Sequence, residues 1–382
     1  MEKDTPDQSA PSEDNQSDSA QTRRRKIEHI DICLQEDVQS KRSTLFDEID
    51  FIHRALPEID KSAIDLTTNF LGLRSAAPIV ISAMTGGHPQ TYDINKRLAE
   101  AAEEMRIPIG VGSQRAAVED PSLSRTFKVV RECAPNCPVI ANIGATHVEV
   151  APDAIEMIDA DVLAIHLNPL QEAIQPEGDC NSAGFLDNIA EIRAIVDIPI
   201  IVKETGAGIS ASVAKELEDV GIDAIDVGGV GGTSWSAVEY YRAMKEGDSM
   251  KAQLGQEYWD WGIPTALSVI MTTAATDLPV IATGGVRSGL DVAKALALGA
   301  MSAGIAYPLL APAANGTMQD VVTKLKGFTE SLRVAMYLTG CDCVDDLAAQ
   351  PLLLGPRLTS TLQALNIEYR KPRRGARDHI FR

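Results

Sequence analysis

The sequence predicts an α/β protein, a TIM (β/α)8 barrel with an N-terminal arm and a C-terminal helical extension. The chain has 382 residues, which suits a barrel that carries extensions. Hydrophobic residues make up 45% of the chain and aromatic residues only 4%, as in a core built from Ala, Ile and Val. Eight short, apolar, β-branched runs also recur along the chain and alternate with helical segments.

The eight runs are the predicted barrel strands. Each ends in small or polar residues, and helical segments such as 94–105 and 289–300 lie between them. A parallel sheet buried on both faces requires such continuous apolar runs. An open doubly wound sheet is the alternative, but its first strand usually leads into a G-x-G-x-x-G turn, where this chain has MTGG. The runs are 78–84, 107–113, 138–144, 162–168, 199–204, 224–229, 279–285 and 301–307.

The remaining segments are predicted from composition and spacing. The long gap between the sixth and seventh runs, roughly residues 235–278, indicates an insertion at the top of the barrel, and it contains all three tryptophans. The residues after the last strand are expected to form helices that cover the barrel or build an oligomer contact. The predicted regions are a disordered acidic tail (1–22), an N-terminal arm and lead-in (23–77), the barrel (78–316), the C-terminal helical extension (317–367) and a basic tail (368–382).

Charge and composition exclude several classes of protein. The net charge is −19, from 54 acidic and 35 basic residues, which argues against a general nucleic-acid or anionic-membrane surface. No apolar stretch is long enough to span a membrane, and the N-terminus lacks the apolar core of a secretory signal. Six irregularly spaced cysteines favour reduced thiols over a zinc site. We therefore expect a cytoplasmic protein.

Polar residues follow almost every predicted strand. The carboxyl ends of barrel strands form the active face, so the side chains there are expected to surround a polar ligand. They are Met84, Thr85, Ser113, Gln114, Arg115, Asn142, His166, Asn168, Gln171, Glu172, Lys203, Glu204, Thr233, Arg287 and Tyr307.

The last two strands carry a phosphate-binding pattern. ATGGVRSGLDVAKALALGA places two glycines and Arg287 on one loop, and Gly304 to Tyr307 lie on the next. Loops after strands seven and eight of such barrels commonly bind phosphate through backbone N–H groups and a helix N-terminus. The alternative is that the two glycines form only a strand-to-helix turn.

A second constellation, HLNPLQE, follows the fourth strand. A single carboxylate such as Glu172 suits Mg²⁺, which keeps most of its waters and also binds substrate phosphates. On the next strand Lys203 could form a Schiff base or contact an anionic cofactor; the neighbouring Glu204 favours a charged lysine and the second role.

Three elements could face anions: the arm from Arg25 to His29, the Ser113–Arg115 run and the GG-x-R loop. One phosphorylated ligand does not need all three, whereas a cofactor phosphate and an anionic substrate would. Arg115 could clamp the substrate, since guanidinium binds phosphate oxygens bidentately. The alternative for the arm is a solvated basic patch.

These motifs together resemble those of the type 2, FMN-dependent isopentenyl diphosphate isomerases. The matching pieces, in order, are RKIEHI, AMTGG, GVGSQRAA, NIGA, HLNPLQE, VKETG, GGTSW, DWGIPT and ATGGVRSGLDVAKALALGA, and they span roughly residues 23–345. GGVR is shared with many FMN barrels, whereas RKxEH, HLNxxQE and DWGxPT in one chain are far more specific.

The resemblance implies an enzyme of isoprenoid biosynthesis that interconverts isopentenyl diphosphate and dimethylallyl diphosphate. It implies FMN and Mg²⁺, with NADPH as the reductant of the flavin and the reduced flavin itself transferring the proton. It also implies a homo-oligomer (a tetramer or octamer) with no nucleic-acid or membrane partner. The intermediate would be a tertiary carbocation, and an anionic reduced flavin favoured by Lys203 would supply the negative charge.

The resemblance also assigns site residues, with Gln171 and His166 as supporting catalytic candidates and Glu172 as the Mg²⁺ ligand. Family members often have Leu at the position of Tyr307, and some have Ser near Gly228. The implied diphosphate contacts are Arg25, Lys26, His29, Ser113, Gln114, Arg115, His166, Asn168 and Gln171. The implied FMN contacts are Ala83, Met84, Thr85, Ser113, Asn142, Lys203, Thr233, Gly285, Val286, Arg287, Ala306 and Tyr307.

Two other functions are weighed. An FMN-dependent 2-hydroxy-acid oxidase or dehydrogenase shares the phosphate loop, but it places a histidine base at the end of the strand before GG-x-R. The corresponding stretch here, DVGGVGGTSW, has no histidine. A non-catalytic flavin- or phosphate-binding protein would need neither HLNPLQE nor a basic arm.

Overall fold

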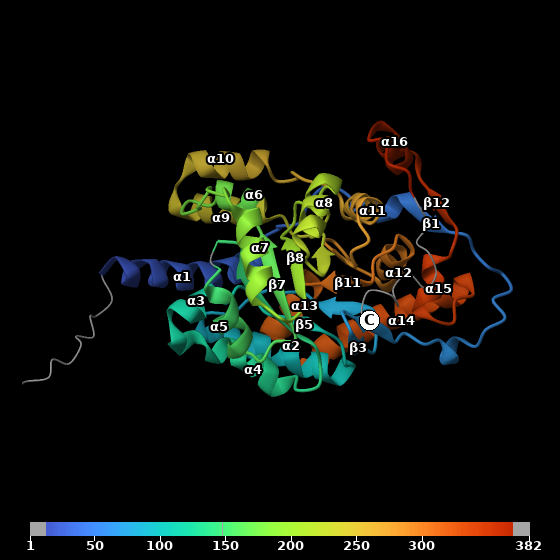
Figure 1. The fold of residues 1–382 in the computed structure, drawn as a ribbon, viewed down its shortest axis with the longest axis horizontal. Helices are drawn as coiled ribbons and strands as arrows, with labels where there is room; N and C mark the ends of the chain where they lie inside the picture. The colour runs from blue at the N-terminus through green and yellow to red at the C-terminus, as the bar shows by residue number, and fades with distance from the viewer. Residues whose placement is uncertain (1–12, 147, 370–382) are drawn as a thin grey trace, which may run out of the picture.

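The structure is a computed structural model that describes residues 13–146 and 148–369 (Figure 1). Eight parallel strands form a closed barrel in the order β10-β11-β4-β5-β6-β7-β8-β9, so the predicted fold is confirmed. Each predicted run contains one strand. The strands are β4 (Ile79–Ile81), β5 (Ile109–Gly110), β6 (Val139–Gly144), β7 (Val162–Leu167), β8 (Ile200–Glu204), β9 (Ala224–Asp226), β10 (Val280–Thr283) and β11 (Ser302–Ile305).

Helices surround the barrel, and their apolar faces share one large core with the outward side chains of the strands. The helical content follows the spacing predicted from the sequence; α2, for example, has six buried residues on one face. The surrounding helices are α2 (Tyr92–Met105), α4 (Arg125–Cys133), α5 (Val150–Met157), α7 (Phe185–Ile195), α8 (Ala211–Val220), α11 (Thr265–Ala275), α12 (Gly289–Ala297), α13 (Tyr307–Asn315) and α14 (Met318–Thr339).

A hairpin closes the amino-terminal end of the barrel. Strands β2 (Thr68–Phe70) and β3 (Leu73–Ser75) pair antiparallel. Phe70 at the end of β2 and Leu71 in the turn are buried among the inward-facing strand residues. This end is therefore filled by apolar side chains. In the part of the chain that the structure describes, this leaves the opposite end, where the strands terminate, for a ligand.

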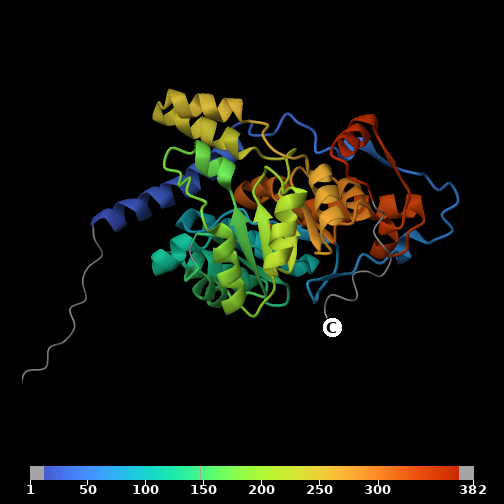
Figure 2. The ribbon, with the colours of Figure 1, turned by 45° about the horizontal axis from the view of Figure 1, so that its top comes forward.

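The arm forms helix α1 (Glu13–Gln35), which lies beside α9 (Trp235–Glu246) (Figures 1 and 2). Ile32 and Cys33 are buried against α9. The helix begins within the segment 1–22 for which disorder is predicted, ahead of the predicted arm boundary at residue 23. No proline or glycine interrupts Glu13–Gln35.

The predicted insertion at the barrel top is a helical hairpin of α9 and α10 (Ser249–Glu257). It stands above the barrel next to α6 (Pro169–Ile174) (Figure 1). The remainder of the predicted segment does not belong to the insertion, because α11 returns to the outer layer. The short helix α3 (Arg115–Glu119) lies under the arm (Figure 1).

The C-terminal extension packs against the lead-in segment and does not cover the open end of the barrel. Strand β12 (Leu352–Leu354) pairs antiparallel with β1 (Ile49–Phe51), so the lead-in and the C-terminal extension brace each other beside the barrel. The predicted basic tail (368–382) lies outside the described residues from residue 370 onward. The other elements are α15 (Val344–Ala348), α16 (Pro356–Ala364), η1 (Phe46–Glu48), η2 (Lys61–Ala63), η3 (Pro89–Thr91) and η4 (Pro121–Leu123).

Among the helices that the structure describes, none combines the length and apolarity needed to cross a membrane.

Helix α12, which follows the predicted phosphate loop, is seated tightly on α14. A Cβ atom at Gly289 would lie 2.1 Å from the carbonyl oxygen of Phe328 and 2.2 Å from the amide nitrogen of Leu332. Both contacting atoms belong to the backbone of α14, and a helix backbone cannot easily move to make room for a Cβ. The start of α12 is therefore fixed relative to the extension.

We expect Gly289→Ala to lower the free energy of unfolding by about 1–3 kcal/mol through overpacking. Gly327→Ala is the matched control, because a Cβ there meets nothing within 4 Å; in a helix interior this change should stabilise by roughly 0.5–1 kcal/mol. Urea denaturation followed by circular dichroism measures both. Equal effects of the two substitutions would contradict the close contact.

Candidate functional site

A cavity of about 780 Å³ lies at the carboxyl ends of the barrel strands. Its walls come from the strand ends, the arm and the loop between α6 and α7. All but one of the predicted site residues line it, so the topology brings together residues from almost the whole chain. They are Arg25, Lys26, His29, Ala83, Met84, Thr85, Ser113, Arg115, Asn142, His166, Asn168, Gln171, Glu172, Lys203, Thr233, Gly285, Val286, Arg287, Ala306 and Tyr307.

Gln114 is the exception, and its geometry does not support the predicted contact with the diphosphate. Its side chain is fully buried. Its Nε2 donates to the carbonyl oxygen of Ala154 (2.8 Å), and its Oε1 accepts from the amide of Asn142 (3.0 Å). Gln114 points away from the cavity at the start of α3 and braces the end of β6.

The loops after β9 and β10 form a wall of bare backbone. Gly284 and Gly285 have φ values of +111° and +70°, which glycine adopts without strain. A Cβ at Gly284 would lie 2.1 Å from the carbonyl oxygen of Gly229, and one at Gly232 would lie 2.5 Å from the amide nitrogen of Gly285. Only glycines fit at this contact, which leaves main-chain groups at the cavity and suits a phosphate.

Helix α13, which follows the eighth strand, presents its N-terminus to the cavity. Helix α12 is closed by a capping box between Ser288 and Asp291, so its first amides are already engaged. Helix α13 has no side-chain cap, and its first residues, Ala306 and Tyr307, line the cavity. An uncapped helix N-terminus attracts anions.

Arg287 belongs to the loop after β10 and contacts Gln39 and Tyr307. Its Nη2 donates to Oε1 of Gln39 (2.5 Å), and its guanidinium lies 5.6 Å from the ring centre of Tyr307. The Gln39 contact ties the phosphate loop to the chain just after the arm. Together with the glycines and the α13 terminus, Arg287 gives this wall the donor set for a mononucleotide phosphate.

The arm contributes the cations Arg25 and Lys26 to another part of the cavity lining, so it is not a solvated patch. Lys26 is half-buried, and its Nζ donates to the carbonyl oxygen of Ser113 (3.3 Å). Burial, with the nearby charge of Arg25, lowers the pKa of Lys26 to about 8. The ring of His29 packs edge-on against Trp235, with their centres 5.0 Å apart.

A buried carboxylate that sequence analysis missed, Glu239 on α9, holds two of the predicted substrate contacts. Its Oε1 lies 2.9 Å from Nε2 of His29 and accepts from Nε2 of Gln171 (3.0 Å). Burial alone would raise the pKa of Glu239, but the contacts with His29, Arg242 and Gln171 bring it to about 2. Glu239 is therefore a buried anion that orients both side chains.

Arg242 completes this network and connects it to the rim. Its side chain is 3% exposed and donates to Glu239 (2.8 Å), Glu177 (2.9 Å) and Glu28 (3.2 Å). Glu28 is on the arm and Glu177 on the α6–α7 loop. Arg242 thus joins three segments that are distant in sequence. Glu239 and Arg242 are three residues apart in WSAVEYYRAMKE, a spacing common on exposed helix faces, so the sequence carried no signal of their burial.

His166 is held as a neutral imidazole. Nδ2 of Asn142 donates to the carbonyl oxygen of Val111 (3.0 Å), which directs its Oδ1 at Nδ1 of His166 (3.0 Å). Burial, together with the charges of Lys203 and Lys26, lowers the pKa of His166 to about 3. Nδ1 therefore carries the proton, and Nε2 is an acceptor.

Lys203 and Glu204, at the end of β8, differ in role. Nζ of Lys203 donates to the carbonyl oxygen of Glu204 (2.9 Å) and lines the cavity. Burial raises the pKa of Glu204 to about 7, although backbone amides oppose the shift. Its carboxylate accepts from the amides of Gly206, Ala207 and Gly208, so Glu204 braces the next loop.

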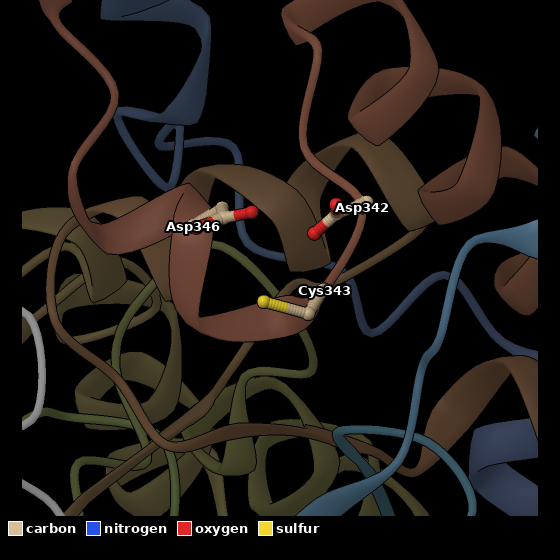
Figure 3. Close-up of side chains that lie close together, drawn as sticks. All are labelled: Asp342, Cys343 and Asp346. Atoms are coloured by element: carbon tan, nitrogen blue, oxygen red, sulfur yellow. The ribbon is translucent and has the colours of Figure 1, made fainter. Parts of the chain in front are cut away.

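A separate group of possible metal ligands lies in the C-terminal extension. Asp342, Cys343 and Asp346 bring their ligand atoms within 4.8 Å of one another at the start of α15 (Figure 3). None of them lines the cavity. Burial raises the pKa of the Cys343 thiol, which disfavours the thiolate a metal would need.

Sequence comparisons identify close relatives. The model of the FMN-dependent dehydrogenase family matches residues 19–122 and 168–353. An isopentenyl-diphosphate delta-isomerase of Methanothermobacter thermautotrophicus is 49% identical over 91% of this chain and 97% of its own length. The enzyme of that name from Methanothrix thermoacetophila is 50% identical over 91% and 98%, and the one from Pyrococcus furiosus 47% over 86% of each chain.

Solved structures with this fold are more distant in sequence. A lactate oxidase of Pediococcus acidilactici has a TM-score of 0.61 at 16% identity and covers 89% of this chain and 94% of its own. A flavocytochrome b2 variant with benzoylformate also has a TM-score of 0.61 at 16% identity, covering 97% and 91%. At such identities the likeness concerns the barrel fold alone. The near-50% relatives and the FMN family match place this chain in the family of type 2, FMN-dependent isopentenyl-diphosphate delta-isomerases.

Proposed function

We propose that this protein interconverts isopentenyl diphosphate and dimethylallyl diphosphate, with reduced FMN and Mg²⁺ bound in the barrel mouth. The observation that carries the proposal is the presence of two anion-binding walls in one cavity. The glycine loops with Arg287 suit the FMN phosphate. The arm with Arg115 suits a diphosphate, and a single phosphorylated ligand would leave one of these walls unused.

The residues present fit FMN. Its phosphate would be held by the backbone wall at Gly284 and Gly285 and by the start of α13. The hydroxyl oxygen (Oγ1) of Thr85, which is buried without a partner among the described residues, offers a polar contact for the ring. When bound, reduced FMN supplies negative charge and an exchangeable proton beside the reacting carbons. Lys203 is the cation available to stabilise the reduced, anionic form.

The chain's contribution to the reaction is binding, orientation and charge. Arg25, Lys26 and Arg115 would neutralise the diphosphate far from the reacting carbons, so their binding energy positions the alkene. His29, whose pKa is lowered by burial, would contribute a hydrogen bond and not a charge. Arg115 forms an ion pair with Glu119 (2.6 Å) on the exposed face of α3 and would exchange this partner for the ligand. Glu239 keeps Gln171 and His29 in place at the cavity.

The rival function is oxidation of a 2-hydroxy acid, as the fold relatives suggest. The cavity histidines are His29 and His166. His29 is engaged by Glu239, and His166 lies near the end of β7, whereas the stretch after β9 contains no histidine. Lactate turnover by the FMN-loaded enzyme that rivals its isomerase rate would favour this function instead.

Reduction by NADPH, assembly into a tetramer or octamer, and a cytoplasmic location remain predictions of the sequence analysis.

Arg287→Ala is expected to weaken FMN binding at least about tenfold, because a charge-assisted hydrogen bond to the phosphate contributes ~1.5–3 kcal/mol. Flavin absorbance at 450 nm, relative to protein after gel filtration, measures retention. Arg357→Ala, an exposed position in α16, is the control. Undiminished flavin occupancy in Arg287→Ala would contradict the assignment of the phosphate wall.

Glu172→Gln is expected to abolish Mg²⁺-dependent isomerisation while FMN stays bound, because the neutral amide is a poor ligand for a hard cation. Product formation is measured with Mg²⁺ and with excess chelator, and flavin content is measured in parallel. If the wild-type enzyme were equally active in both conditions, the metal assignment would be wrong.

The pH dependence of substrate affinity should report Lys26. Its ammonium is charged below the pKa of about 8 and neutral above it, so KM for isopentenyl diphosphate should rise several-fold, roughly tenfold per pH unit at most, as pH increases from 8 to 9.5. Lys26→Arg keeps its charge throughout and should flatten the profile. An identical rise in the arginine variant would assign the titration to another group.

A further inference from the structure

We propose that Gln175 is a positioning residue for the divalent cation. Its amide nitrogen fixes the Glu172 carboxylate, and its carbonyl oxygen accepts a hydrogen bond from a water bound to the cation. The inference rests on the proposed function, which assigns Mg²⁺ to Glu172, and it adds a residue that the motif HLNPLQE does not contain.

The Glu172 carboxylate is held by three donors. Oε1 accepts from Nδ2 of Asn168 (2.9 Å), and Oε2 accepts from Nε2 of Gln175 (2.7 Å) and from the amide of Asp179 (3.0 Å). A carboxylate offers about four lone-pair sites. Both sites on Oε2 are occupied, so Oε1 retains one. The carboxylate is therefore arranged to bind a cation through a single oxygen.

The orientation of the Gln175 amide follows from this contact. An ionised carboxylate only accepts hydrogen bonds, so the NH₂ group of Gln175 must face Glu172 and its Oε1 must point elsewhere. The side chain is 1% exposed and lines the cavity. Within the part of the chain that the structure describes, its buried Oε1 has no hydrogen-bond partner.

A buried carbonyl oxygen without a partner is unfavourable. A metal-bound water would supply the missing donor, since Mg²⁺ keeps several of its waters and polarises their O–H bonds. Outer-sphere partners of this kind orient the ligands of a metal and commonly change its affinity 10–100-fold.

The backbone after α6 is folded around Glu172. The amide of Gly178 donates to the carbonyl oxygen of Gln175 (3.2 Å), which turns the chain back. A Cβ at Gly178 would lie 1.8 Å from the carbonyl oxygen of Glu172, so only glycine permits this approach. The turn delivers the Asp179 amide to the carboxylate. Gln175 and this turn thus form one cradle for the proposed metal ligand.

The test uses Gln175→Leu and the unbranched Gln175→Met in the FMN-loaded enzyme. Mn²⁺ binding in the presence of isopentenyl diphosphate is measured by the loss of the free-Mn²⁺ EPR signal, and isomerisation is measured as a function of Mg²⁺ concentration. Gln350→Leu is the matched control, because Gln350 is a half-buried glutamine of the C-terminal extension whose side chain donates to the carbonyl of Asp346 (3.3 Å) and does not line the cavity.

We expect Mn²⁺ affinity to fall about tenfold in both Gln175 variants, and their isomerase activity to return at raised Mg²⁺ with an unchanged flavin content. The control should match the wild type. Mn²⁺ affinity within twofold of the wild type in both variants would overturn the inference, as would an activity loss that no Mg²⁺ concentration restores, since that result indicates a purely structural contact.

If the proposed function is wrong, the same measurements give different results. If the wild-type enzyme isomerises its substrate equally well in chelator and binds no Mn²⁺, the metal assignment and this inference both fall. If the wild-type enzyme binds Mn²⁺ but does not isomerise, the proposed function fails while the Mn²⁺ affinities of the variants still decide the role of Gln175.

Discussion

The pairing of Glu239 with Arg242 is the interaction on which the barrel mouth depends. Both side chains are buried on α9, and through them the arm, the insertion and the α6–α7 loop converge. Removing one partner of such a buried pair leaves an uncompensated charge and typically costs ~3–5 kcal/mol. The network therefore fixes the arm in the one position where Lys26 and His29 reach the cavity.

The two sides of the cavity achieve anion binding by different means. On the side of β10 and β11 the groups are mainly backbone, packed so closely that glycine is obligatory, and they belong to the rigid barrel. On the other side they are long basic side chains on a helix that approaches from outside. This division suits a resident cofactor held by the scaffold and a substrate that must come and go past the arm.

Much of this arrangement is predictable from the sequence, because local patterns determine it. Eight apolar runs ending in polar residues specify the strands and their common rim, and GG-x-R marks the phosphate wall. What could not be predicted depends on packing between distant segments. Glu239 and Arg242 have the spacing of an exposed helix face, and they are buried by the docking of α1 together with α6 and the α6–α7 loop. Gln114 lies between two cavity residues, but the first turn of α3 directs it into the core. Gln175 matters because of its orphan oxygen, which no motif reveals.

The central claim is that one barrel mouth holds FMN and a prenyl diphosphate at the same time, on two separate sets of anion-binding groups. A crystal structure of the FMN-loaded enzyme with isopentenyl diphosphate tests it most directly. The account predicts density for the flavin phosphate against Gly284–Arg287 and the start of α13, with the diphosphate between Arg25, Lys26 and His29. Density for a diphosphate on the flavin-phosphate wall, or outside the cavity, would contradict it.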